Sequence, residues 1–223
     1  MNSLTRNNEL RSNPELLKTL LDISNLVSST MEIRPLLEAI LDKLRNIIEY
    51  NNAKIFIFSG NQARIIAHRS VLKPDSEDKY PLPLGIEQIM KKKPVVIDDI
   101  YSDEEMALAF RRQMGEYMDT VFRDSRSWMS LPMITKNKVI GVLTLDHSKA
   151  GFYKEHHIEL GMAFANQAAI EYENAKLYNE TAKRADEIKT MFNIQQAITS
   201  RLEIDSVLKL IAGEALRLSN SHS

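Results

Sequence analysis

The sequence contains no cysteine among its 223 residues. This absence excludes disulfide bonds, thiolate metal sites, cysteine nucleophiles and chromophores attached through a thioether. It also fits a reducing, intracellular setting, so we expect a cytoplasmic protein. Glycine is scarce as well, with 7 residues, and the sequence has no glycine-rich phosphate-binding loop.

Long hydrophobic runs are absent too. No stretch approaches the roughly 20 apolar residues that cross a bilayer, and the polar first residues lack the apolar centre of a signal peptide. The charges nearly cancel, because 29 basic and 30 acidic residues give a formal charge of -1. A balanced chain has no net field that attracts nucleic acid or an anionic membrane. We therefore expect a soluble piece that binds no nucleic acid and inserts into no membrane, with an anchor elsewhere in a longer parent left open.

Hydrophobic residues make up 43% of the chain, which is enough for a core of ordinary size. Apolar residues at helical spacing predict helices, and a change to a period of two predicts strands. Two-residue turns at Gly60-Asn61 and Lys136-Asn137 join strands into hairpins. The predicted helices are 14–27, 35–48, 85–93, 103–122 and 154 to about 199; the predicted strands are 53–59, 62–69, 94–98, 127–135 and 138–146, with a loop at 71–84.

This order of elements predicts an α+β fold. The central sheet is expected to be antiparallel, with the terminal helices bundled on one face and a helix-and-loop cover on the other.

The last predicted helix carries a weak heptad pattern. Ile170, Leu177, Met191 and Ile198 recur at multiples of seven, with Arg184 interrupting the series. This spacing predicts a homodimer through the terminal helices. The alternative is a single helix that lies on its own domain as far as 178 and is solvated beyond it. The companion heptad line is mostly polar: Asn174, Thr181, Ile188 and Gln195.

The N-terminal helix pair reappears near the C-terminus. Residues 23–37 read ISNLVSSTMEIRPLL, and residues 194–208 read IQQAITSRLEIDSVL. One such pair cannot bury its apolar face alone. We therefore expect residues 200–223 to be the truncated start of a second repeat. A coincidence between two amphipathic helices is the alternative.

Three stretches resemble the GAF domains of bacterial signalling proteins. The most specific one combines 151–153 (GFY), 163–170 (AFANQAAI) and 173–178 (ENAKLY) in order. The other two are 126–133 (RSWMSLPM) followed by 139–146 (VIGVLTLD), and 85–86 (GI) with 93–99 (KPVVIDD). Together they cover roughly residues 16–180.

The resemblance implies a fold and a role. Family members have an antiparallel sheet, with the first and last helices bundled on one face and a ligand pocket under a loop-rich connection on the other. They typically dimerise through the terminal helices and pass a signal to a following output domain. No output signature is present in this sequence, so we expect the output domain elsewhere in the same parent chain.

The sequence also departs from parts of the family. Cyclic-nucleotide-binding members carry Asn-Lys, then Phe, then Asp-Glu; Asn137-Lys138 and Phe152 match this pattern, but His156 stands where Asp is expected. Bilin-binding and methionine-sulfoxide-reducing members use cysteine, which is absent. The sequence therefore names no cofactor, and it favours a binding module over an enzyme.

Thioether and aromatic side chains are concentrated in the segment expected to cover the sheet and on the strands. Such side chains suit a pocket that closes around a small, partly apolar ligand. The alternative is a filled core without a cavity. The predicted ligand-binding residues are Phe56, Phe58, Met106, Phe110, Met114, Met118, Phe122, Trp128, Leu143, Leu145 and His147.

No metal or catalytic site is predicted. His156 and His157 are adjacent on a helix, so their rings are expected to point to different faces, and no histidine pair has the spacing of a zinc site. No Ser-His-Asp set stands at a recognisable spacing.

The predicted organisation is an N-terminal tail (1–13), a GAF domain (14–180), a helical connector (181–199) and the truncated second repeat (200–223). We expect a sensory module that binds a small-molecule ligand and relays a helix shift through the connector. The alternative is a ligand-free module that only dimerises.

Overall fold

Six strands form one antiparallel sheet in this computed structural model, which describes residues 32–70 and 79–220. The strand order is β3-β2-β1-β6-β5-β4, and every neighbouring pair is antiparallel. The predicted α+β class with an antiparallel central sheet is confirmed. The strands are β1 (Asn52–Ser59), β2 (Gln62–Arg69), β3 (Lys79–Pro81), β4 (Val95–Ile97), β5 (Ser127–Thr135) and β6 (Lys138–His147).

Two tight turns fix the hairpins, as the sequence predicts. Lys136 and Asn137 both adopt positive φ, at 46° and 65°, which gives the right-handed twist that a two-residue hairpin needs. Gly60 takes a φ of 59° between β1 and β2. The register of β5 against β6 and of β1 against β2 is therefore set locally by these turns.

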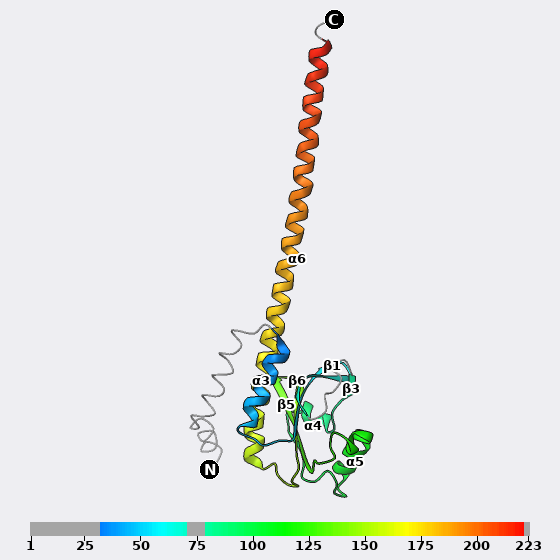
Figure 1. Cartoon of the computed structure of the whole chain (residues 1–223), viewed down its shortest axis with the longest axis vertical. Coiled ribbons are helices and arrows are strands. Elements are labelled where there is room, and N and C mark those ends of the chain that lie inside the picture. The colour runs from blue at the N-terminus through cyan, green and yellow to red at the C-terminus, as the bar shows by residue number, and fades with distance from the viewer. Residues whose placement is uncertain (1–31, 71–78, 221–223) are drawn as a thin grey trace. The chain divides into compact units, whose positions relative to one another are not determined.

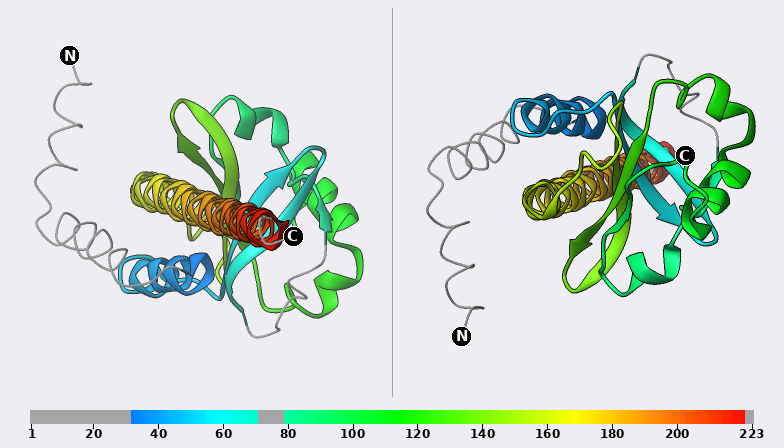
Figure 2. Two further views of the ribbon diagram at one scale, coloured as in Figure 1. Left: turned by 90° about the horizontal axis from the view of Figure 1, so that it is seen from above. Right: turned by 90° about the horizontal axis from the view of Figure 1, so that it is seen from below.

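Helices cover both faces of the sheet (Figure 1, Figure 2). On one face lie α3 (Ile33–Arg45) and the first part of α6 (Glu155–Asn220), whose apolar side chains pack on Leu143 and Leu145. On the other face lie α4 (Ile86–Met90), α5 (Glu105–Met114) and the 3-10 helix η1 (Gly115–Asp119). The helix predicted at 35–48 corresponds to α3, which buries Leu36, Leu37, Ile40, Leu41 and Leu44.

The largest differences from the predicted elements are three. The predicted loop at 71–84 contains the strand β3, which pairs with the start of β2. The predicted helix 103–122 is shorter, because Gly115 adopts a φ of 50° and ends α5. The last helix does not end near 199 but continues to Asn220, since residues 197–207 contain no glycine or proline to stop it. The predicted tail at 1–13 and helix at 14–27 lie outside the described residues.

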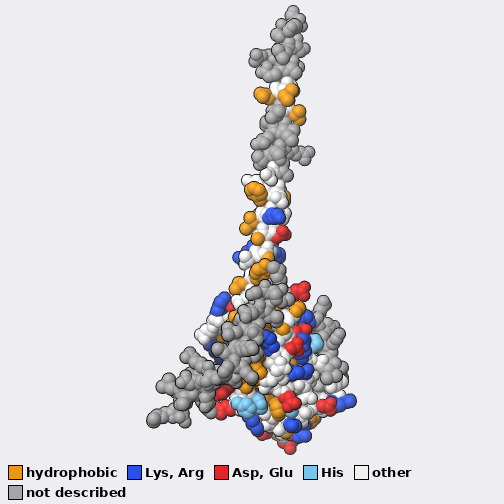
Figure 3. All heavy atoms as spheres, turned by 60° about the vertical axis from the view of Figure 1, so that its left-hand side comes forward, with side chains coloured by type: hydrophobic (Ala, Val, Ile, Leu, Met, Phe, Trp, Pro, Cys, Tyr) orange, Lys and Arg blue, Asp and Glu red, His pale blue; other side chains and the backbone are white. Residues whose placement is uncertain are grey.

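The chain divides into two compact units, Met1–Lys176 and Leu177–Ser223. In the second unit the described residues form part of α6 and expose several hydrophobic side chains (Figure 3). The described residues of this unit form one helix, and the second repeat stays a prediction. No helix within 32–70 and 79–220 has the length and apolar character that crossing a bilayer requires.

Gly141 in β6 offers a test of the sheet's packing. A methyl group there would lie 2.0 Å from the backbone oxygen of Phe56, next to the irregular register of β5 at Met133 and Ile134. We expect Gly141→Ala to lower the free energy of unfolding by about 3 kcal/mol, because the strands must move apart. Urea denaturation followed by circular dichroism measures this loss.

Gly60→Ala, in the turn between β1 and β2, is the control. Nothing lies within 4 Å of its added methyl group, so the cost is the left-handed backbone alone, about 1 kcal/mol. Equal stabilities of the two variants would contradict the close approach at Gly141.

Candidate functional site

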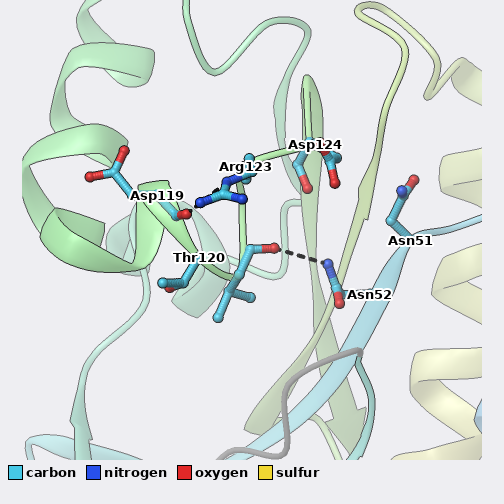
Figure 4. Close-up of a pocket in the computed structure, with 8 residues that line it drawn as sticks. Asn51, Asn52, Asp119, Thr120, Arg123 and Asp124 are labelled. Atoms are coloured by element: carbon cyan, nitrogen blue, oxygen red, sulfur yellow. Dashed lines mark hydrogen bonds between the residues drawn. The ribbon is translucent and has the colours of Figure 1, made fainter.

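A half-open cavity of about 330 Å³ lies where β1 begins (Figure 4). One wall is made by Asn51 and Asn52, at the start of β1. The opposite wall is the segment 119–125, which leads from η1 towards β5. The volume falls at the lower end of the range for small-molecule sites. The lining residues are Asn51, Asn52, Asp119, Thr120, Val121, Arg123, Asp124 and Ser125.

A buried carboxylate, Asp146, ties the two walls together. Its Oδ1 accepts hydrogen bonds from Asn52 Nδ2 at 3.0 Å and from Ser125 Oγ at 2.6 Å. Asn52 Nδ2 also donates to the carbonyl oxygen of Val121 at 3.3 Å, and Asn52 Oδ1 accepts from Ser70 Oγ at 2.8 Å. The side chains of both buried wall residues therefore hold the strand and the crossing segment in one position.

Burial shifts the pKa values of two interacting groups, Asp146 and Lys54. It raises the pKa of Asp146 to about 6, although hydrogen bonds from Ser125 and Asn52 and the charge of Lys54 act in the other direction. Burial also lowers the pKa of Lys54, opposed by the charge of Asp146. The Lys54 ammonium lies 5.3 Å from the centre of the Phe122 ring, an arrangement that favours the charged lysine.

Most of the predicted ligand-binding side chains do lie together, beneath α4, α5 and η1. They pack against each other: the ring centres of Phe110 and Phe122 are 5.1 Å apart, and so are those of Phe110 and Trp128. None of them lines the cavity, although Phe122 lies between the lining residues Val121 and Arg123. Whether they contact a ligand stays a prediction. The set is Phe56, Phe58, Met106, Phe110, Met114, Met118, Phe122 and Trp128.

The structure does not bring Leu143, Leu145 and His147 to this group. Leu143 and Leu145 belong to the core under α3 and α6, and the His147 ring stacks on Phe152 with centroids 3.6 Å apart. The reason is the period of two along β6, which turns every second side chain to the opposite face. These three residues therefore lie apart from the other predicted ones, and whether they bind a ligand stays a prediction.

The sequence prediction missed the polar residues that build the cavity. Asp146 was treated only as the end of a strand, and the segment 119–125 as the end of a helix. The alternation Val142, Thr144, Asp146 was the available signal, because it places the carboxylate on the same face as Trp128, its pairing partner across the strands.

The adjacent histidines also differ from expectation. His156 Nε2 and His157 Nε2 lie 3.0 Å apart, so the two rings do not diverge. His157 Nδ1 accepts the backbone N–H of Lys154 at 3.1 Å, which fixes that ring back over the first turn of α6. Within the described part of the chain, no group of three or more His, Cys, Asp and Glu side chains is placed to hold a metal ion.

The model of one family, the GAF domain, matches residues 32–172. Among solved structures, the chain is similar to the phycoerythrobilin-bound GAF domain from a cyanobacterial phytochrome, with a TM-score of 0.57 and 16% identity over 74% of this chain and 97% of that one. It is also similar to free methionine-R-sulfoxide reductase from Neisseria meningitidis, solved with its substrate, with a TM-score of 0.55 and 15% identity over 73% and 91%. These identities establish a shared fold.

A third similar structure is the chromophore-binding domain of an unusual bacteriophytochrome from R. palustris. The TM-score is 0.54 and the identity 12%, over 76% of this chain and 64% of that one. This chain therefore spans less than two thirds of that domain's length. Among curated proteins, none matches the sequence.

The raised pKa of Asp146 predicts a specific dependence of stability on pH. Between pH 4 and 6 the folded protein holds a proton on Asp146 that the unfolded chain releases, because the pKa is about 6 in the fold and 3.8 ordinarily. The contribution of Asp146 to the free energy of unfolding is therefore largest below pH 4. It falls by up to about 3 kcal/mol as the pH rises to 6. Asp146→Asn cannot titrate but still accepts hydrogen bonds from Asn52 and Ser125.

The measurement is urea denaturation of wild type and Asp146→Asn from pH 4 to 8. Subtracting the two curves cancels the titration of all other carboxylates. The wild type should lose stability relative to the variant between pH 4 and 6 and then run parallel to it. A stability difference that is constant with pH, or that changes in the opposite direction, would show that the pKa of Asp146 is not raised.

Proposed function

This chain belongs to the GAF domain family, whose model covers residues 32–172, and we propose that it is a sensory or regulatory domain of a larger signalling protein. In this proposal it binds a small ligand and passes the signal through α6 to an output domain in the same parent chain. The half-open cavity of about 330 Å³ carries the proposal, because it is a concave site of the size that small ligands occupy. Thiol-based chemistry is closed to a chain without cysteine, which favours binding over catalysis.

Asp146 provides a route from this cavity to α6. It accepts hydrogen bonds from both walls, and the next residue, His147, stacks on Phe152. Phe152 precedes the first residue of α6, Glu155, by three positions. A ligand that displaces the segment 119–125 would thus alter the packing at the start of the helix. The relay requires that α6 have two arrangements and that the ligand bind one of them better.

We also propose that two copies of the chain associate through α6. Ile188 and Met191, which lie on the two heptad lines, are 67% and 71% exposed. Leu177 on the same lines is exposed as well. Apolar side chains at this spacing become buried when two helices form a coiled coil.

A ligand-free dimerisation module is the second candidate function. The packing of the aromatic cluster favours it, because Phe110 and Trp128 are buried between the sheet and its cover. The two candidates agree on the dimer and differ on whether the cavity takes a ligand.

Ligand binding is tested by filling the cavity. Thr120 is an exposed lining residue, so Thr120→Trp should occupy the space without opening the core. In a thermal-shift screen of small metabolites, we expect at least one compound to raise the Tm of the wild type. A ligand at a hundred times its Kd stabilises by about 2.7 kcal/mol, which is a shift of a few degrees.

Thr120→Trp should abolish that shift. Leu108→Trp is the control, since Leu108 is 40% exposed on α5 and outside the cavity, and it should keep the shift. A wild type that no compound stabilises would favour the ligand-free module instead.

The dimer is tested by placing charges on the heptad lines. The double variant Ile188→Glu with Met191→Glu should be monomeric, because carboxylates at these positions would face each other in the coiled coil. Ala182→Glu adds a carboxylate to an exposed position off both lines and should stay dimeric. Sedimentation velocity measures the mass of each; a monomeric wild type at tens of micromolar would reject the proposed dimer.

A further inference from the structure

Part of the cavity lining is already engaged and serves as scaffold. Asn52 and Ser125 are buried, and their side chains bind Asp146, Val121 and Ser70. Asn51 Oδ1 accepts the backbone N–H of Ser148 at 2.9 Å. These contacts fix the cavity's shape, so recognition falls to the groups that remain.

The remaining charged groups come from the segment 119–125. Arg123 Nε donates to the backbone oxygen of Asp119 at 3.0 Å, which orients the guanidinium and leaves its two Nη groups without a partner in the described part of the chain. The side-chain carboxylates of Asp119 and Asp124 form no hydrogen bond or ion pair with any described residue. Figure 4 shows Arg123 and Asp124 on one side of the cavity and Asn51 and Asn52 on the other, whereas the Asp119 carboxylate points away from Asn51 and Asn52.

This combination selects by charge. A simple anion would meet the carboxylate of Asp124, and a simple cation would be placed beside the guanidinium of Arg123. A ligand that carries both charges can satisfy both kinds of group. A guanidinium binds a carboxylate through paired hydrogen bonds, and the carboxylate of Asp124 pairs with an ammonium.

From this charge pattern we infer that the cavity binds a small zwitterion with the ammonium and carboxylate of a free α-amino acid. The ligand carboxylate binds the Nη groups of Arg123 and the side-chain Nδ2 of Asn51, and the ligand ammonium binds Asp124. Among the described residues that line the cavity, Val121 alone is apolar, so the ligand side chain is short or polar. A volume of about 330 Å³ holds such a molecule with bridging water. This inference rests on the proposed function, since it names the ligand class of the same cavity.

The first experiment measures binding of the twenty common L-amino acids to the full chain by thermal shift and then by isothermal titration calorimetry. We expect at least one short or polar amino acid to bind. Its N-acetyl derivative lacks the ammonium and its C-terminal amide lacks the carboxylate, and each should bind at least tenfold more weakly, because one charged contact is lost. Equal binding of either derivative would overturn the zwitterion.

The second experiment changes the protein. Arg123→Gln and Asp124→Asn should each weaken the amino acid at least tenfold. Arg112→Gln on α5 and Asp103→Asn before it are matched controls, since both residues are exposed and outside the cavity, and they should leave the affinity unchanged. Variants that bind as tightly as wild type would overturn the assignment of these residues.

The outcomes separate this inference from the proposed function. If no amino acid binds but another metabolite does, and Thr120→Trp abolishes that binding, the zwitterion is wrong and the ligand-binding sensor stands. If no compound of either set binds, both are wrong.

Discussion

The pairing of β6 with β1 on one side and β5 on the other is the constraint on which the rest of the structure depends. It places alternate side chains of one strand in two different environments: Leu143 and Leu145 in the core under the helices, Val142 in the core under the cover. Asp146 at the end of the strand then meets the start of β1 and the segment 119–125. A carboxylate at this depth is costly unless it is hydrogen-bonded, and Asn52 and Ser125 both donate to Oδ1 of Asp146. The site exists because the strand carries a polar residue where its apolar run stops.

Much of the fold could be predicted from the sequence, because its signals are local. The two hairpins follow from Gly60-Asn61 and Lys136-Asn137, whose backbone angles the turns require. The strand β3 was missed because its three residues carry no pattern of their own and gain their structure by pairing with β2. The early end of α5 at Gly115 could have been read from that glycine, but the apolar residues at four-residue spacing continue beyond it to Phe122.

The site was less predictable, because both faces of the sheet are buried. The seven residues of β5 from Ser127 to Met133 are all buried, so polar alternation does not reveal which face each side chain takes. The aromatic cluster was found because rings and thioethers are conspicuous. The cavity was not, because its walls depend on the path of the main chain through 119–125 and on contacts between residues far apart in sequence, such as Asn52 and Asp146.

Both outer strands of the sheet are only three residues long, which has a consequence for how the protein behaves at high concentration. Pro81 in β3 has no N–H to offer a neighbouring sheet, and Pro94 stands directly before β4. Short edge strands with a proline in or next to them offer an incoming strand too few backbone hydrogen bonds to bind it. Fibril-like growth by sheet extension is thereby disfavoured.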